Sequence, residues 1–118
     1  MNVFKILRPE EWHLARYTSE YYGSPDDIRD GFVHLSDAVQ LPGTLARHFP
    51  ADKTLHLLAF DTADLGDALK WEMSRGGEKF PHFYGALPVG KAIAVHRLTR
   101  GPDEAFLLPE LSSLSSPE

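Results

Sequence analysis

Seven residues with side chains suited to acid–base or hydrogen-bond chemistry lie in stretches that are otherwise apolar or aromatic. They are His34, Ser36, Gln40, Thr44, Glu72, His82 and Tyr84. A histidine exchanges protons near neutral pH, and a carboxylate beside apolar groups can have a raised pKa. We therefore take His34 and Glu72 as candidate catalytic residues. The other members of the set are candidate ligand contacts, with donors and acceptors that suit a ribose or an amide.

The spacing of the first few residues carries further information. His34 and Ser36 lie two positions apart in an apolar run, so a strand would present both on one face. Asp37 and Gln40 are separated by three positions and resemble a helix capping box. That interpretation would make Gln40 a structural residue instead of a ligand contact.

The other candidates also have structural interpretations. His34 could be a buried strand histidine bonded to Glu72 or Tyr84, Glu72 could be a surface carboxylate, and His82 with Tyr84 could hold a loop to the sheet. Trp71 is expected in the core. An open cleft shared by His34 and Glu72 would favour function, whereas burial with mutual hydrogen bonds would favour a structural network.

The sequence lacks the familiar metal and nucleotide motifs. It holds 6 histidines and no cysteine, and no two histidines have metalloprotease spacing. Gly76 and Gly77 match neither the P-loop nor the dinucleotide fingerprint, and no G-x-S-x-G nucleophile elbow occurs. We therefore predict no metal site and no tightly bound zinc in the purified protein.

Size and charge limit the class of protein. The 118 residues suit one domain, and the net charge of −5 argues against nonspecific binding to nucleic acid. No stretch approaches the roughly 20 apolar residues of a membrane span, and the first residues do not resemble a signal peptide. We expect a cytoplasmic domain at residues 1–100 and a partly disordered extension at 101–118, frayed from residue 112. The oligomeric state is left open.

The elements that must position the candidate residues follow from periodicity and turn chemistry. Strands are expected at residues 4–7, 32–35, 55–60, 69–73 and 92–96, with 55–60 as a central strand. Helices are expected from Pro9 to about residue 18 and from Pro42 to about residue 49. Residues 23–27 read as a loop, and residues 80–85 as an irregular segment because of Pro81.

Four strings resemble a known family when they are taken in order. They are residues 31–36 (GFVHLS), Gln40 with Thr44, Trp71 with Glu72, and residues 80–85 (FPHFYG). Over about residues 4–98 the chain resembles the bacterial family known as domain of unknown function 952. That family has no settled activity, so the resemblance implies a fold and a site without a reaction.

A more distant resemblance is to the ADP-ribosyltransferase-like folds, because residues 33–36 (VHLS) look like a strand of RNA 2′-phosphotransferases. Those enzymes bind NAD in a cleft between two small sheets, so the resemblance allows NAD as a ligand without identifying the cofactor. The superfamily uses a His on the first strand, a Tyr or His on the second and often a Glu on a later one. Lys5 stands where the first His would fall, His34 would occupy the second position, and Glu72 a late one. The missing His leaves catalysis open.

The expected fold is α+β, with a mixed or split sheet of about five or six strands and two main helices. The expected function is binding of a nucleotide-like small molecule, such as NAD or ADP-ribose, in a cleft around His34. An enzyme of this kind would transfer ADP-ribosyl or glycosyl groups, with His34 orienting a ribose hydroxyl, Glu72 polarising the ribose or acceptor, and Tyr84 stacking. The alternative is a non-catalytic module for a small molecule or a partner protein, in which the His, Glu and Tyr cluster is a structural network.

Overall fold

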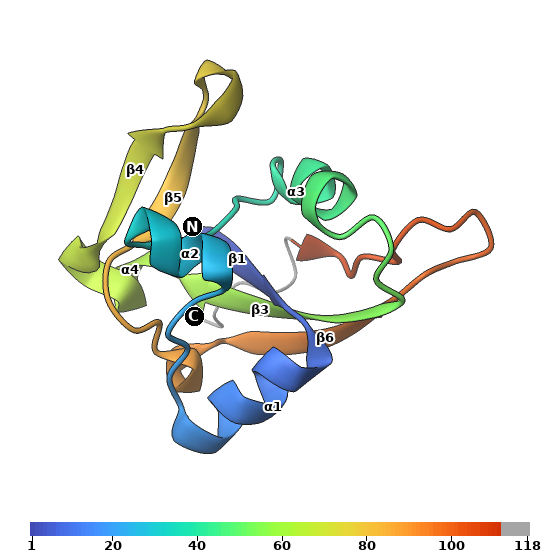
Figure 1. Ribbon diagram of the computed structural model, residues 1–118, viewed down its shortest axis with the longest axis horizontal. Coiled ribbons are helices and arrows are strands. Elements are labelled where there is room, and N and C mark those ends of the chain that lie inside the picture. The colour runs from blue at the N-terminus through green and yellow to red at the C-terminus, as the bar shows by residue number, and fades with distance from the viewer. Residues whose placement is uncertain (112–118) are drawn as a thin grey trace.

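Two small antiparallel sheets form the framework of the protein. The computed structural model describes residues 1–111, apart from the side chain of Arg75. These residues form two three-stranded sheets and four α-helices (Figure 1). The α+β class and the split sheet are thereby confirmed. The fraying predicted from residue 112 lies outside the described residues.

The elements follow one another in a mixed order. They are β1 (Asn2–Leu7), α1 (Pro9–Thr18), α2 (Pro25–Asp30), β2 (Val33–His34), α3 (Leu41–His48), β3 (Thr54–Asp61), α4 (Thr62–Leu65), β4 (Leu69–Met73), β5 (Lys79–Phe83) and β6 (Ala94–Thr99), with short 3-10 turns at Gly66–Ala68, Arg75–Gly77 and Val89–Lys91.

The first sheet has the order β1-β3-β6, so β3 is its central strand. Leu55, Leu57, Leu58 and Phe60 of β3 are fully buried, as a strand covered on both faces requires. This confirms the central strand predicted at residues 55–60. The last strand begins later than predicted, at Ala94, because the chain is still leaving the 3-10 turn at Val89–Lys91.

The second sheet has the order β2-β5-β4, and its central strand runs through Pro81. The irregular segment predicted at residues 80–85 is therefore wrong for residues 80–83, which belong to β5. Leu35 donates its N–H to the carbonyl of Pro81 at 3.0 Å, while Pro81 has no N–H with which to return the bond. Because β2 ends at His34, the missing bond falls where the ladder stops and costs the sheet little.

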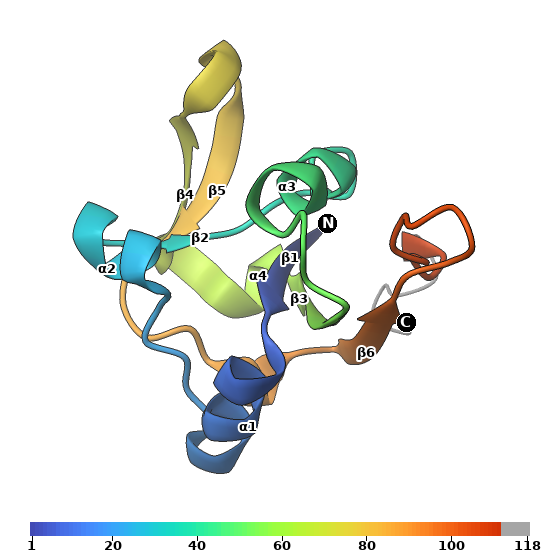
Figure 2. The same cartoon turned by 45° about the vertical axis from the view of Figure 1, so that its right-hand side comes forward.

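The two sheets are joined just beyond β2. The backbone of Ser36 pairs with Phe4 of β1 through two hydrogen bonds, of 2.7 and 3.0 Å. The chain therefore leaves the second sheet after His34 and meets the edge of the first, which explains why β2 is shorter than predicted. Figure 2 shows β2 beside β5, between α2 and α3.

The strands of the first sheet separate two apolar clusters. We call the cluster of Val3, Leu7, Leu58, Phe60, Val33 and Phe83, with their buried neighbours, the inter-sheet core because both sheets contribute to it. We call the second cluster, with Phe4, Ile6, Leu41, Leu45, Leu55, Leu57 and Leu98, the α3 core. Alternation along β1 places Lys5 on the same face as Val3 and Leu7, towards the inter-sheet core.

Hydrogen bonds between side chains and backbone N–H groups lie at the start of the first helix and in the turn before the third. α1 begins at Pro9, as predicted, and the Glu11 carboxylate accepts the backbone N–H of Arg8 at 2.8 Å. Before α3, Asp37 and Gln40 each accept the other's backbone N–H through their side chains, at 3.0 and 2.8 Å. The predicted reciprocal hydrogen bonds of this pair are therefore present, in the turn that precedes α3.

The loop predicted at residues 23–27 is wrong from Pro25 onward, because α2 starts there. Ser24 is the N-cap and accepts the N–H of Asp27, Pro25 takes the first helical position, and Asp26 lies in the first turn. Serine, proline and aspartate favour both turns and helix starts, so composition alone did not distinguish the two.

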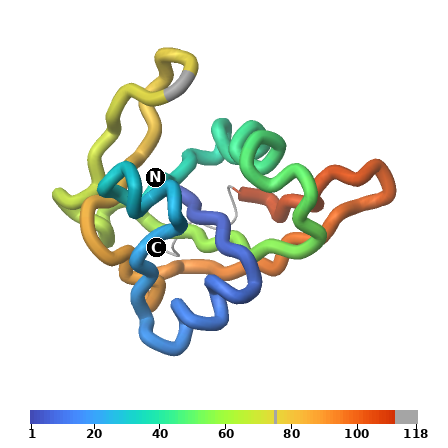
Figure 3. The backbone as a smooth tube through the Cα atoms, viewed as in Figure 1, coloured from blue at the N-terminus to red at the C-terminus, as the bar shows by residue number. Residues whose placement is uncertain are grey.

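Residues 101–111 return to the body of the protein (Figure 3). Phe106, Leu108 and Leu111 pack against the α3 core. The Arg100 guanidinium donates to the carbonyl groups of Phe49, Pro50, Asp52 and Glu104, which fixes the start of this segment. Within the described part of the chain, no helix has the length and apolar character needed to cross a membrane.

Candidate functional site

A buried ion pair links β1 to α2. Asp27 is only 3% exposed and Lys5 only 8%, and the Lys5 ammonium lies 3.1 Å from Oδ2 of Asp27. Lys5 also donates to the carbonyl of His34 at 2.9 Å. A buried charge needs a partner and further hydrogen bonds, and each residue supplies them for the other. Lys5 thus joins three elements: β1, α2 and β2.

His34 continues this network towards solvent. Its Nδ1 is hydrogen-bonded to Oδ1 of Asp27, and its Nε2 lies 3.0 Å from Oδ2 of Asp30. An ionised carboxylate can only accept, so Nδ1 must carry a proton. The His34 side chain is 35% exposed, in contrast to Asp27 beneath it. Both ring nitrogens thus face carboxylates, Asp27 beneath the ring and Asp30 at the surface, so a ligand that bonds to Nε2 must displace Asp30.

The electrostatics of the network keep Asp27 charged. Burial alone would raise the pKa of the Asp27 carboxyl, but hydrogen bonds from His34, the Lys5 charge and the backbone N–H of Ser24 outweigh it. The pKa of Asp27 is therefore held well below its usual value. At the surface, the Arg29 guanidinium likewise lowers the pKa of Asp30, with a smaller contribution from His34.

A second histidine lies beside the first on the same face of the second sheet. His34 of β2 is paired with His82 of β5, and their ring centroids are 5.5 Å apart. Phe32 covers both rings: it stacks on His82 with centroids 3.9 Å apart and is tilted against His34 at 4.7 Å. Phe32 was not among the sequence candidates, although it lies only two residues before His34 in the same predicted strand.

Glu72 belongs to the His82 part of this face. Its Oε1 accepts from the Tyr84 hydroxyl at 2.7 Å and lies 2.9 Å from Nδ1 of His82. The hydrogen bonds from Tyr84 and His82 lower the pKa of the Glu72 carboxyl, and in return Glu72 raises the pKa of the Tyr84 phenol. Glu72 therefore contacts neither His34 nor Asp27 through any hydrogen bond found among the described residues.

The candidates downstream of β2 are held by the protein itself. Ser36 is buried, and its hydroxyl is 2.7 Å from that of Thr44 in α3. The Gln40 amide donates to Oε1 of Glu78 at 3.0 Å and to the carbonyl of Lys79 at 2.7 Å. Gln40 thus ties the start of α3 to the β4–β5 hairpin.

A large cleft lies between the two sheets, with a volume of about 880 Å³. It is lined from β1 by Lys5, from α2 by Asp27 and Asp30, from β2 by His34, and by residues of α3 and β5. We call it the inter-sheet cleft. Four of the seven sequence candidates line the cleft: His34, Gln40, Thr44 and His82. The other three, Ser36, Glu72 and Tyr84, do not.

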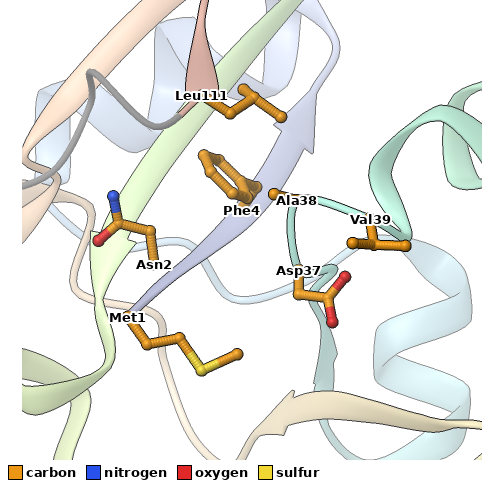
Figure 4. Close-up of a pocket in the computed structure, with 7 residues that line it drawn as sticks. All are labelled: Met1, Asn2, Phe4, Asp37, Ala38, Val39 and Leu111. Atoms are coloured by element: carbon orange, nitrogen blue, oxygen red, sulfur yellow. The ribbon is translucent and has the colours of Figure 1, made fainter.

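A smaller hollow of about 310 Å³ lies at the start of β1 (Figure 4). Its lining consists of Met1, Asn2, Phe4, Asp37, Ala38, Val39 and Leu111. The carboxylate of Asp37 is its one ionisable side chain, and it already accepts the N–H of Gln40. None of the sequence candidates lines this hollow, so the inter-sheet cleft is the better candidate site.

Sequence reasoning missed most of the charged residues around His34. Asp27 and Asp30 were overlooked because α2 was interpreted as a loop, although Ser24 and Asp27 have the spacing of a capping box. Lys5 carried a signal as well: a cation in an apolar strand implies a buried partner. Among the described residues, no three His, Asp or Glu side chains are grouped so that they could hold a metal ion.

Comparison with known proteins identifies the family but no activity. The model of the family "Protein of unknown function (DUF952)" matches residues 6–95. None of the curated proteins matches the chain.

The solved structures of protein CC0527 from Caulobacter crescentus, a structural-genomics target, are similar over nearly the full length of both chains. Its crystal structure shares 38% sequence identity and a TM-score of 0.86, covering 97% of this chain and 98% of the other. Its solution NMR structure has 38% identity and a TM-score of 0.79, with 95% and 94% coverage. This chain therefore belongs to the DUF952 family of proteins of unknown function.

Proposed function

We propose that the protein binds a nucleotide-like small molecule in the inter-sheet cleft, with His34 as the principal polar contact. The observation that carries this proposal is the path Lys5–Asp27–His34, which runs from a buried ion pair to a partly exposed ring in the cleft. A ring held in place by buried charges is ready to bind a ligand without first being ordered.

The size and composition of the cleft support a small-molecule ligand. Its 880 Å³ falls within the range of roughly 300–1,000 Å³ that is usual for such sites. Apolar side chains such as Ile6 and Phe80 line it together with the charged residues. A ligand with an apolar ring and polar substituents, such as a nucleotide, matches this mixture.

Arg47 of α3 favours an anionic group on the ligand. It lines the cleft and is exposed, and among the described residues its side chain forms no ion pair or hydrogen bond. The other cleft cations are already paired: Lys5 with Asp27, Arg8 with Asp52, and Arg29 with Asp26 and Asp30. A guanidinium without a protein partner suits a phosphate group.

The resemblance to ADP-ribosyltransferase-like folds supports the same class of ligand, because that superfamily holds NAD between two small sheets. Catalysis is not part of the proposal. Lys5 stands in place of the first-strand His, and Glu72 is bonded to His82 and Tyr84 outside the cleft. For Glu72 the observed hydrogen bonds favour the alternative of a structural network.

A thermal-shift titration with ADP-ribose, NAD and AMP tests the proposal. A ligand at about 100 times its Kd adds about 2.7 kcal/mol to the free energy of unfolding, which is a shift of several degrees in a domain of this size. We expect at least one of the three nucleotides to produce such a shift, and His34→Ala to abolish it.

The matched control is His13→Ala, which removes an exposed histidine of α1 that does not line the cleft. His34→Ala leaves Asp27 bonded to Lys5 and Ser24, so we expect it to lower the free energy of unfolding by only about 1–2 kcal/mol. A larger loss with an unchanged nucleotide shift would make His34 a structural residue. No shift with any of the nucleotides would contradict the proposal itself.

A further inference from the structure

One buried polar atom of the site has no hydrogen-bond partner in the part of the chain that the structure describes. His82 is only 3% exposed, and its Nε2 forms no hydrogen bond with any described residue. Buried polar side-chain atoms are nearly always paired, so an unpaired nitrogen at a cleft calls for an explanation. His82 lines the inter-sheet cleft beside His34.

Glu72 determines what this nitrogen can do. The Glu72 carboxylate can only accept hydrogen bonds, so Nδ1 of His82 carries the proton that joins them at 2.9 Å. With the proton on Nδ1, the neutral ring presents a bare lone pair at Nε2. Glu72 is therefore a positioning residue: it fixes the tautomer of His82 from outside the cleft.

We propose that the ligand of the inter-sheet cleft donates a hydrogen bond to Nε2 of His82. This inference rests on the proposed function, and it adds that the ligand carries a small donor group, a sugar hydroxyl or an amide N–H. A bare lone pair repels phosphate oxygens, so this end of the cleft selects against a purely anionic ligand.

The packing around His82 agrees with a small donor. Phe32 stacks on the face of the ring, with an interplanar angle of 20°. Approach is then along the ring edge, in the plane in which the Nε2 lone pair lies. Because Nε2 is almost fully covered, a hydroxyl or N–H must project from the ligand into the floor of the cleft.

The experiment compares two probes, ADP-ribose and inorganic pyrophosphate: both carry a diphosphate, but only ADP-ribose adds sugar hydroxyls and an adenine amino group that can donate hydrogen bonds. Imidazole ¹⁵N NMR of the wild-type protein should show His82 protonated at Nδ1 and bare at Nε2. ADP-ribose should move the Nε2 resonance towards that of a hydrogen-bonded nitrogen, and pyrophosphate should leave it in place. This readout needs no variant, so it holds even where a substitution at His82 prevents folding.

Affinity measurements with His82→Phe complete the test, since phenylalanine keeps a planar ring for Phe32 but lacks Nε2. We expect Kd for ADP-ribose to rise about five- to tenfold, the value of one neutral hydrogen bond, and Kd for pyrophosphate to stay unchanged. The control is His13→Phe, the same substitution at an exposed histidine of α1 that does not line the cleft, which should affect neither probe.

The outcomes separate the two proposals. If ADP-ribose binds but neither the Nε2 resonance nor the affinity of His82→Phe responds, the inference about His82 is wrong and the proposed function stands. If none of ADP-ribose, NAD and AMP binds to the wild-type protein, the proposed function fails and this inference fails with it. Stoichiometric zinc coordinated by Nε2 would also overturn it, because the lone pair would then serve a metal.

Discussion

At Asp27, four hydrogen bonds converge on one buried carboxylate, from the Lys5 ammonium, the Ser24 N–H, the His34 N–H and the His34 ring. Each donor comes from a different part of the local structure: β1, the start of α2, and the backbone and side chain of β2. A carboxylate so enclosed is ionised at all physiological pH values, and it holds the His34 ring in one orientation.

Replacing Asp27 should be costly because it leaves the Lys5 charge buried without a counterion. We expect Asp27→Asn to lower the free energy of unfolding by about 3–5 kcal/mol at pH 7, measured by urea denaturation. Lys5→Met combined with Asp27→Asn should be less destabilised than Asp27→Asn alone, since the unpaired charge is then removed. A double variant as unstable as the sum of the single variants would show that the two residues do not act as a pair.

The lowered pKa of Asp27 also predicts a pH dependence with a definite sign. In the unfolded chain the Asp27 carboxyl has its ordinary pKa of 3.8, so it becomes protonated near that pH. In the folded protein the carboxyl stays ionised to a lower pH. Its contribution to stability is therefore complete only above about pH 5 and is lost progressively as the pH falls further. Urea unfolding from pH 6 to 2.5 should show a steeper loss for the wild type than for Asp27→Asn. Asp67→Asn, at an exposed carboxylate, should retain the wild-type slope.

At the scale of elements, α2 is the helix that places Asp27 and Asp30 beside His34. A glycine lies at each end of it, Gly23 before the N-cap with φ 120° and Gly31 as the C-cap with φ 85°. Both angles favour glycine, but their surroundings differ. A Cβ on Gly23 would lie 2.8 Å from Cβ of Asp27, whereas a Cβ on Gly31 would meet nothing within 4 Å.

This difference yields a paired prediction. Gly31→Ala should lower the free energy of unfolding by about 1–2 kcal/mol, the usual cost of a left-handed residue with a side chain. Gly23→Ala adds a clash with the Asp27 side chain, so the total loss should reach about 3 kcal/mol or more, and α2 should shift. Urea denaturation measures both. Equal losses in the two variants would mean that the Asp27 contact is relieved without cost.

At the scale of the whole molecule, β3 holds the protein together because its two faces serve different cores. Leu58 packs into the inter-sheet core and its neighbour Leu57 into the α3 core. Since one strand is shared by both clusters, loss of either core removes the support of the other. We therefore expect the described domain to unfold in one cooperative step.

Leu57→Ala and Leu58→Ala test this expectation. Both side chains are fully buried, so each variant should lose about 2–5 kcal/mol of unfolding free energy. Each should retain a single urea transition with the wild-type slope. A second transition in either variant would show that the two cores unfold independently.

Much of the fold could be predicted from the sequence because the signals were local. The buried run of β3, the proline-started α1 and the reciprocal Asp37–Gln40 cap each depend on residues a few positions apart. The start of α2 carried an equally local signal in Ser24, but it was interpreted as a turn. Pro81 led to the opposite error, because it suggested an irregular segment where the structure has a strand. A proline is tolerated in β5 because β2 ends beside it.

The sequence by itself determined the residue types, the main strands and helices, and the placement of His34 on a strand. Only the tertiary structure decided which side chains meet. Asp27 joins Lys5 across 22 positions, and Glu72 joins His82 instead of His34. Such partners depend on how the two sheets are joined at Phe4 and Ser36 and on where each strand ends. Hydrophobic periodicity fixes the face on which a side chain lies, but it does not fix which element will stand opposite, because packing between distant segments sets that choice.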